Sequence, residues 1–98
     1  MKLAIQLASG LESEDVRTVK KLAEAALAQG HQVSLFLMDD GIYAASSLQD
    51  LAPKGAAIAL CATNALQRGL QPMEGVLFGG QNDWAAMVHD SDRVLHFG

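Results

Sequence analysis

The sequence predicts an α/β fold in which a five-stranded, mainly parallel sheet carries helices on both faces. Short apolar runs alternate with helical segments along all 98 residues. The first run, from Lys2 to Ala8, is apolar with little alternation, which is typical of a strand covered on both faces. The segments between runs are long enough for the crossover connections that parallel strands require. We therefore expect three layers, α/β/α, with the flavodoxin-like strand order 2-1-3-4-5.

The first long helix has the clearest local signals. Between about Ser13 and Gln29 the apolar residues recur at helical spacing. Ser13 is suited to be the N-cap, Glu14 and Asp15 favour the positive end of the helix dipole, and Gly30 is placed to end the helix.

The remaining elements follow from shorter signals. Apolar and β-branched runs predict further strands, and turn residues such as Asp, Asn, Gly and Pro separate them. The expected strands are residues 31–38, 56–61, 76–78 and 93–97, and the expected helices are residues 42–47, residues 63–68 and a helix that opens at Asn82 or Asp83.

Size, charge and cysteine content restrict the class of protein. We expect one domain over residues 1–98, because the chain leaves no room for a second core. The chain has seven basic and 11 acidic residues, a net charge of −4, and no run of basic residues. Nucleic acid and anionic membranes are therefore poor partners. The N-terminus lacks the order of a signal peptide, and the single cysteine indicates a reducing compartment, so we expect a cytoplasmic protein.

The expected strand order directs attention to one edge of the sheet. In the order 2-1-3-4-5 the chain reverses direction between the first and third strands, and ligands collect at the carboxyl ends of those strands. These ends are Ser9-Gly10 and the segment that starts at Cys61. Gly79-Gly80 follows the next strand and is expected to form the other lip of a pocket beside Cys61.

Cys61 is the candidate reactive group of this pocket. It ends an apolar strand and precedes Ala62, Thr63 and Asn64, which open a helix. Unpaired N–H groups and the positive dipole at a helix N-terminus favour a thiolate over a thiol. The alternative is that Cys61 is a small buried apolar residue, because free cysteine is among the most buried residue types.

Three segments of the chain resemble the DsrE/DsrF/DsrH-like family, which is also described as the YchN-like fold. The run from Cys61 to Leu70 resembles the family's strand-end cysteine followed by a short helix that closes in Arg-Gly plus an aliphatic residue. Asp40-Gly41-Ile42 resembles its Asp-Gly-aliphatic segment, and Asp92 to Gly98 resembles its closing strand. The resemblance covers nearly the whole chain.

The resemblance implies a sulfur carrier or sulfurtransferase. In the best-known members the cysteine accepts sulfur as a persulfide and passes it to a partner protein, so Cys61 would be the catalytic residue. Ser9, Gly10, Ala62, Thr63, Asn64, Gly79 and Gly80 would line the substrate site. The family also implies assembly into trimers or hexamers of like or sibling subunits, with sulfur donor and acceptor proteins as partners and no cofactor. A non-catalytic oligomeric or regulatory domain of the same fold is the alternative.

Two other kinds of site receive weaker support. The turn Ser9-Gly10-Leu11-Glu12-Ser13 is similar to a phosphate loop of a flavin or nucleotide binder, but its carboxylates would repel phosphate, and we interpret it as a turn and helix cap. Asp39 and Asp40 have the ligand type of a hard cation, yet adjacent carboxylates more often end a strand in solvent. His31, His89 and His96 lie in separate elements and do not have the spacing of metal ligands, so no metal site is expected.

Overall fold

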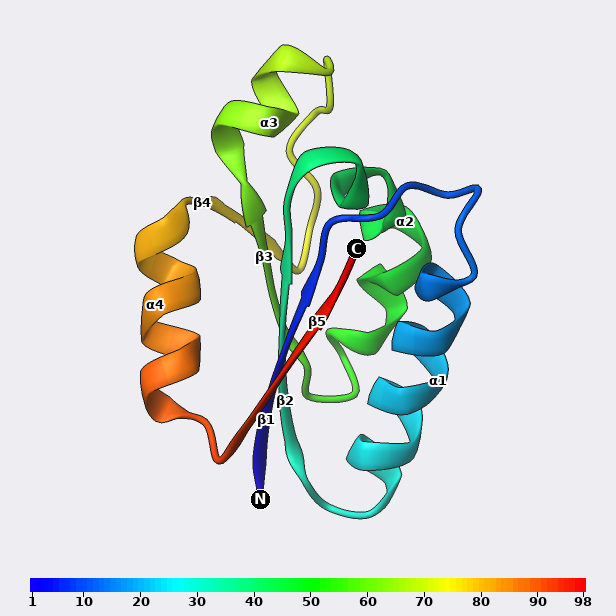
Figure 1. Cartoon of the computed structure of the whole chain (residues 1–98), viewed down its shortest axis with the longest axis vertical. Helices are drawn as coiled ribbons and strands as arrows, with labels where there is room; N and C mark the ends of the chain where they lie inside the picture. The colour runs from blue at the N-terminus through cyan, green and yellow to red at the C-terminus, as the bar shows by residue number, and fades with distance from the viewer.

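A computed structural model describes all 98 residues, and its five strands form one sheet in which every neighbouring pair is parallel (Figure 1). The strands are β1 (Lys2–Leu7), β2 (Gln32–Leu37), β3 (Ala57–Cys61), β4 (Val76–Gly79) and β5 (Arg93–Phe97). Each lies within one residue, at either end, of the run that predicted it. Local apolar content therefore located all five strands.

The connections between the strands are helical. They are α1 (Asp15–Ala28), the 3-10 helix η1 (Asp39–Ala44), α2 (Ala45–Leu48), the 3-10 helix η2 (Gln49–Leu51), α3 (Ala62–Gln67) and α4 (Gln81–Asp90). The expected N-cap at Ser13 is wrong by one residue, because α1 begins at Asp15 and Glu14 occupies the N-cap position. The Ser13 Oγ still accepts the Asp15 N–H at 3.0 Å, so Ser13 supports the first turn from just outside the helix. Gly30 has a φ of 85° and ends α1. No helix is long and apolar enough to cross a membrane.

The strand order corrects the predicted one. The sheet runs β4-β3-β2-β1-β5, so the expected flavodoxin-like order 2-1-3-4-5 is wrong. β1 lies between β2 and β5, and β3 lies between β2 and β4. The physical reason is burial. β2 is too apolar to be an edge strand, whereas the short β4 and the largely exposed β5, which contains Arg93 and His96, tolerate the two edges.

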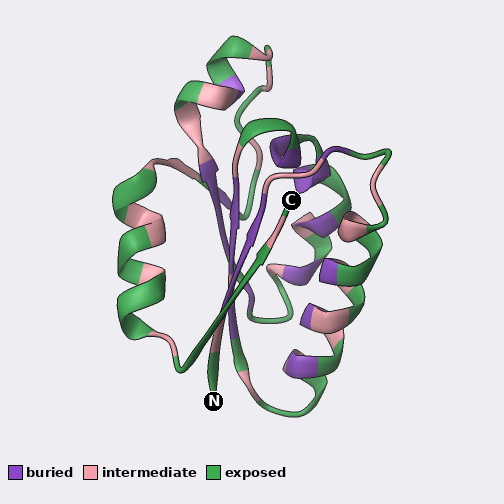
Figure 2. Cartoon of the chain, viewed as in Figure 1, coloured by how far each residue is buried: buried purple, intermediate pink, exposed green.

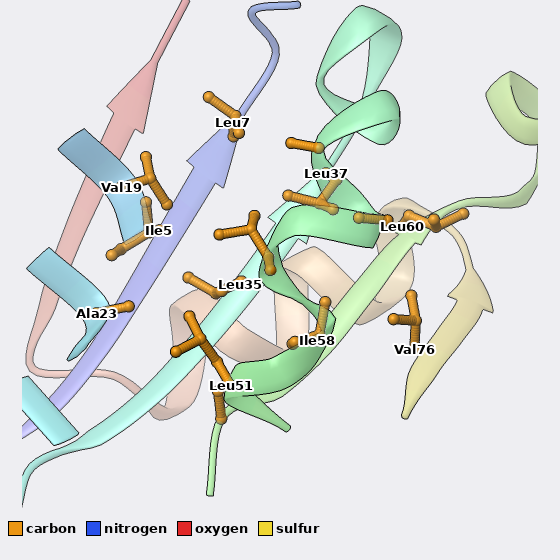
Figure 3. Close-up of a cluster of buried hydrophobic side chains, with 14 of the residues drawn as sticks. Ile5, Leu7, Val19, Ala23, Leu35, Leu37, Leu51, Ile58, Leu60 and Val76 are labelled. Atoms are coloured by element: carbon orange, nitrogen blue, oxygen red, sulfur yellow. The ribbon is translucent and has the colours of Figure 1, made fainter. Parts of the chain in front are cut away.

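The two faces of the sheet are covered unequally (Figures 1 and 2). Because β1 to β4 are added in one direction, α1 and α2 lie on one face, and the return from β4 to β5 places α4 on the other. Figure 3 shows the core on the first face, where aliphatic strand side chains meet α1 and the α2–η2 segment. This core includes Ile5, Leu7, Val19, Ala23, Leu35, Leu37, Leu51, Ile58, Leu60 and Val76.

The α4 face is thinner. Its main contact is a stack between Phe36 of β2 and Trp84 of α4, with ring centroids 6.0 Å apart and an interplanar angle of 29°. Trp84 therefore packs α4 onto the sheet. No residue of α4 is fully buried, however, and Leu77 and Val94 on the flanking strands stay 56% and 44% exposed. A single helix thus leaves both flanks of this face open.

The carboxyl edge depends on a close approach between the η1 turn and β1. Gly41 is buried, and a Cβ placed on it would overlap the carbonyl oxygen of Leu7. The same carbonyl accepts the Met38 N–H at 3.0 Å. The Asp-Gly-aliphatic segment therefore has a steric basis, because only glycine allows the turn to cross the end of β1 at this distance.

We expect Gly41→Ala to lower the free energy of unfolding by about 3 kcal/mol, because the added methyl group must displace backbone on both sides. Urea denaturation followed by circular dichroism measures this loss. Gly80→Ala is the matched control, because nothing lies within 4 Å of its added Cβ, and its cost should stay below about 1 kcal/mol. Equal losses in the two variants would contradict the steric argument.

Candidate thiol site

Cys61 is the last residue of β3 and lies half-buried at the carboxyl edge of the sheet. On one side it pairs with Gly79 of β4. On the other side is the end of β2, where Leu37 pairs with Leu60 and Met38 follows. The thiol is free, and Cys61 is partly exposed where the strand ends and the following helix begins.

The helix that follows Cys61 is short and projects beyond the sheet (Figure 1). Cys61 has an extended backbone, with φ −74° and ψ 111°, and occupies the N-cap position of α3. The prediction that Ala62, Thr63 and Asn64 open a helix is confirmed, with the start at Ala62. With six residues, α3 forms little more than one and a half turns, and its first N–H groups lack partners within the helix.

Two polar contacts join α3 to the η1 turn. The Asp39 N–H donates to Asn64 Oδ1 at 2.8 Å, and Arg68 Nε donates to Asp40 Oδ1 at 3.1 Å. Arg68 occupies the C-cap position of α3. Its guanidinium forms an ion pair with the Asp40 carboxylate.

Gly79 pairs with Cys61 at the ends of β4 and β3, and α4 begins directly after Gly80. The Gly80 N–H donates to Asp83 Oδ2 at 2.8 Å, and the Asp83 N–H donates to the Gly80 carbonyl at 2.9 Å. A Cβ on Gly79 would overlap the Asp83 carboxylate, so glycine is required for this cap. Gln81 Nε2 reaches Met38 Sδ at 3.9 Å and thereby links α4 to the end of β2.

Ser9 and Gly10 lie elsewhere, which corrects the expected pocket. They follow β1, and β2 separates them from Cys61, so the two ends do not face each other. The reversal of chain direction falls between β1 and β5, where the Ala8 N–H donates to the Phe97 carbonyl at 2.9 Å. Cys61, at the end of β3, therefore does not lie at the point where the chain reverses direction. Its position beside Met38 and Gly79 is decided by the observed order.

The turn after β1 is filled by its own carboxylates. Ser9 Oγ donates to Asp15 Oδ2 at 2.6 Å, and the Glu12 carboxylate lies over Gly10. These contacts fit the interpretation as a turn and helix cap. A phosphate would meet both negative groups here, so the geometry is unfavourable for the flavin or nucleotide alternative.

No group of three or more His, Cys, Asp or Glu side chains is arranged to hold a metal ion. The two aspartates that follow β2, Asp39 and Asp40, make different contacts. Asp39 contributes its backbone N–H to Asn64, and Asp40 contributes its carboxylate to Arg68.

Sequence reasoning missed Met38, Asp40, Arg68 and Asp83 as members of this site. A signal for two of them was present, because Asp40 and Arg68 each stand before a glycine in segments that the family resemblance had singled out. Their pairing became visible only when β2 was placed next to β3.

We expect Gly79→Ala to cost about 1 kcal/mol of stability, because the new methyl group displaces Asp83 from the start of α4. A thermal or urea denaturation series checks the value. In an Asp83→Ala background the cap is already lost, so adding Gly79→Ala should change little. Additive losses in the double variant would show that the cap is not the cause.

The comparisons with known proteins identify the same architecture. The profile of the DsrE/DsrF-like family matches residues 1–97, which confirms the resemblance seen in the sequence. The crystal structure of the YchN protein from Escherichia coli has a TM-score of 0.82 and 23% sequence identity, and the match covers 98% of this chain and 97% of that one.

A conserved protein of unknown function from Bacteroides thetaiotaomicron has a TM-score of 0.78 and 12% identity, covering 98% of this chain and 94% of its own. No curated protein matches the chain. At these identities the solved structures speak to the fold alone, and they confirm the predicted YchN-like α/β class.

Proposed function

The chain belongs to the DsrE/DsrF-like family, and from this membership we propose that it is a sulfur carrier that uses Cys61. The family is associated with sulfur relay. The observation that carries the proposal is the place of the only thiol, at the open carboxyl edge of β3 between Met38 and Gly79. This position combines a fixed backbone with access from solvent.

The chemistry needs no cofactor. The Cys61 thiolate attacks the outer sulfur of a donor persulfide, so that a new S–S bond forms at Sγ and the donor leaves as a thiolate. An acceptor thiolate then attacks the outer sulfur on Cys61, takes it, and releases the Cys61 thiolate. Each step exchanges one S–S bond for another, so no external oxidant or reductant is consumed. A reducing compartment such as the cytoplasm would keep the thiol free between cycles.

The chain has no second cysteine that could resolve the persulfide, so the acceptor belongs to another protein. The loops and helix starts that follow the strands are predominantly acidic, and they carry two arginines as their cations. The acidic residues are Glu12, Glu14, Asp15, Asp39, Asp40 and Asp83, and the arginines are Arg17 and Arg68. We infer that donor and acceptor proteins approach this edge with a basic surface, because opposite charge accelerates encounter.

We expect incubation with a low-molecular-weight persulfide donor to add the mass of one sulfur atom to the intact chain, measured by mass spectrometry. Cys61→Ser should abolish the gain, and dithiothreitol should reverse it, because the outer sulfur is held by an S–S bond. No gain in mass, or a gain that survives Cys61→Ser, would overturn the proposal. The protein would then be the non-catalytic domain in which Cys61 only packs.

We also propose that copies of the chain, or sibling subunits, associate through the α4 face. The support is the incomplete cover on that face, where Leu77 and Val94 are exposed on either side of α4 and no α4 residue is fully buried. A small chain gains stability from such association, because its own core buries a limited share of its surface.

Sedimentation velocity should therefore give a mass of several chains, with a trimer or hexamer expected. Leu77→Asp should shift the protein toward the monomer, since a carboxylate would be buried in the interface. Leu11→Asp is the matched control, because Leu11 is 58% exposed in the turn after β1 and lies outside the α4 face. A monomeric wild-type protein, or an unchanged mass for Leu77→Asp, would contradict this assembly.

A further inference from the structure

We propose that Asn64 and Arg68 are positioning residues that hold α3, and with it the Cys61 backbone, against the η1 turn. The proposal deepens the sulfur-carrier function and depends on it for its consequence. Its geometric content, a helix fixed by two polar contacts, stands independently of sulfur transfer. The first observation that carries it is how little else holds α3 in place.

The helix α3 depends on the rest of the chain for its stability. Six residues are too few for a helix that is stable in isolation. Ala65 is its only fully buried side chain, and Leu66 is 83% exposed. Figure 2 shows the same contrast, with exposed and intermediate residues over most of α3 and buried residues along the central strands. The side-chain hydrogen bonds that join this helix and its C-cap to the rest of the chain are the two from Asn64 and Arg68.

The η1 turn offers a rigid support for those contacts. It is tied to β1 by the bond from the Met38 N–H to the Leu7 carbonyl and by the buried Gly41. The Gly41 N–H also donates to the Met38 carbonyl at 2.9 Å, which closes the turn around Asp39. Asp39 has a φ of 50°, a left-handed conformation that aspartate tolerates better than most residues. The contacts of the η1 turn with β1 therefore hold the turn in place independently of α3.

The two contacts differ in chemistry and reinforce each other in space. Asn64 accepts a backbone N–H, so its role requires an acceptor oxygen and is independent of the Asp39 side chain. Arg68 pairs with the Asp40 carboxylate, while the two side chains keep 25% and 59% of their surface exposed. Exposed ion pairs contribute little to global stability. Loss of this one should therefore free α3 locally and leave the fold intact.

The consequence falls on Cys61, which is the residue on which α3 turns away from β3. When α3 is held, the thiol keeps one orientation between Met38 and Gly79. When α3 is released, the N-cap backbone is no longer fixed and the sulfur samples several orientations. The linkage also explains why the Asp-Gly and Arg-Gly segments occur together in this chain, because one supplies the carboxylate and the other the guanidinium.

The test compares Arg68→Ala, Asp40→Ala and the charge exchange Asp40→Arg with Arg68→Asp in the full chain. We expect each single variant to raise the rate of Cys61 alkylation by iodoacetamide by roughly two- to fivefold, the range of an exposed ion pair. Amide hydrogen exchange of residues 62–67 should accelerate alongside it, with no change in the denaturation midpoint. The charge exchange should restore both rates toward the wild-type values.

Two further variants separate positioning from general loosening. Asn64→Ala should accelerate alkylation, whereas Asn64→Asp keeps an acceptor oxygen and should retain most of the wild-type rate. Arg17→Ala is the control, because it removes an arginine from a different ion pair, with Glu14 at 4.0 Å near the start of α1, and it should change neither rate.

Wild-type alkylation and exchange rates in Arg68→Ala and Asn64→Ala would overturn the proposal, as would a charge exchange that restores nothing. The outcomes remain distinct from those of the sulfur-carrier test. Altered alkylation without persulfide formation refutes the carrier function and leaves positioning in place. Persulfide formation with unaltered alkylation supports the carrier function and refutes the positioning role.

Discussion

The packing of Gly41 against the carbonyl oxygen of Leu7 is the contact on which the rest of the carboxyl edge depends. It allows the chain leaving β2 to fold directly over the end of β1 instead of extending into solvent. The η1 turn that results is buried on its inner side and presents Asp39 and Asp40 outward. α3 then has a fixed surface to contact, and the end of β3 is placed beside it.

The unequal cover of the two sheet faces connects the fold to association. On the α1 face the aliphatic side chains of four strands are sealed by α1 and the α2–η2 segment. On the α4 face one ten-residue helix spans the middle of the sheet and anchors through the stack of Trp84 on Phe36. The exposed apolar side chains on either side are those that a further subunit would remove from water.

The proposed chemistry asks little of the surrounding residues. Thiol–persulfide exchange needs a thiolate, access and an acceptor, and it proceeds without a metal or an organic cofactor. The protein's contribution is to hold Cys61 at a defined place and to select which proteins reach it. In this proposal the contacts of Asn64 and Arg68 would serve the first task, and the acidic carboxyl edge would serve the second.

The secondary-structure elements and the place of the thiol along the chain follow from local sequence patterns. Apolar runs located all five strands, helical spacing located α1, and Cys61 was predicted at the end of β3 because the apolar pattern stops there. Which strands are neighbours depends instead on how the elements pack in space. The hydrophobic period and the composition of a strand indicate how far it is buried, and several strand orders are consistent with the same burial. For this reason Ser9 and Gly10 were predicted beside Cys61, whereas β2 lies between them in the structure. The partners of Arg68 and Asp83 were decided in the same way, since an ion pair or a cap depends on distance in space.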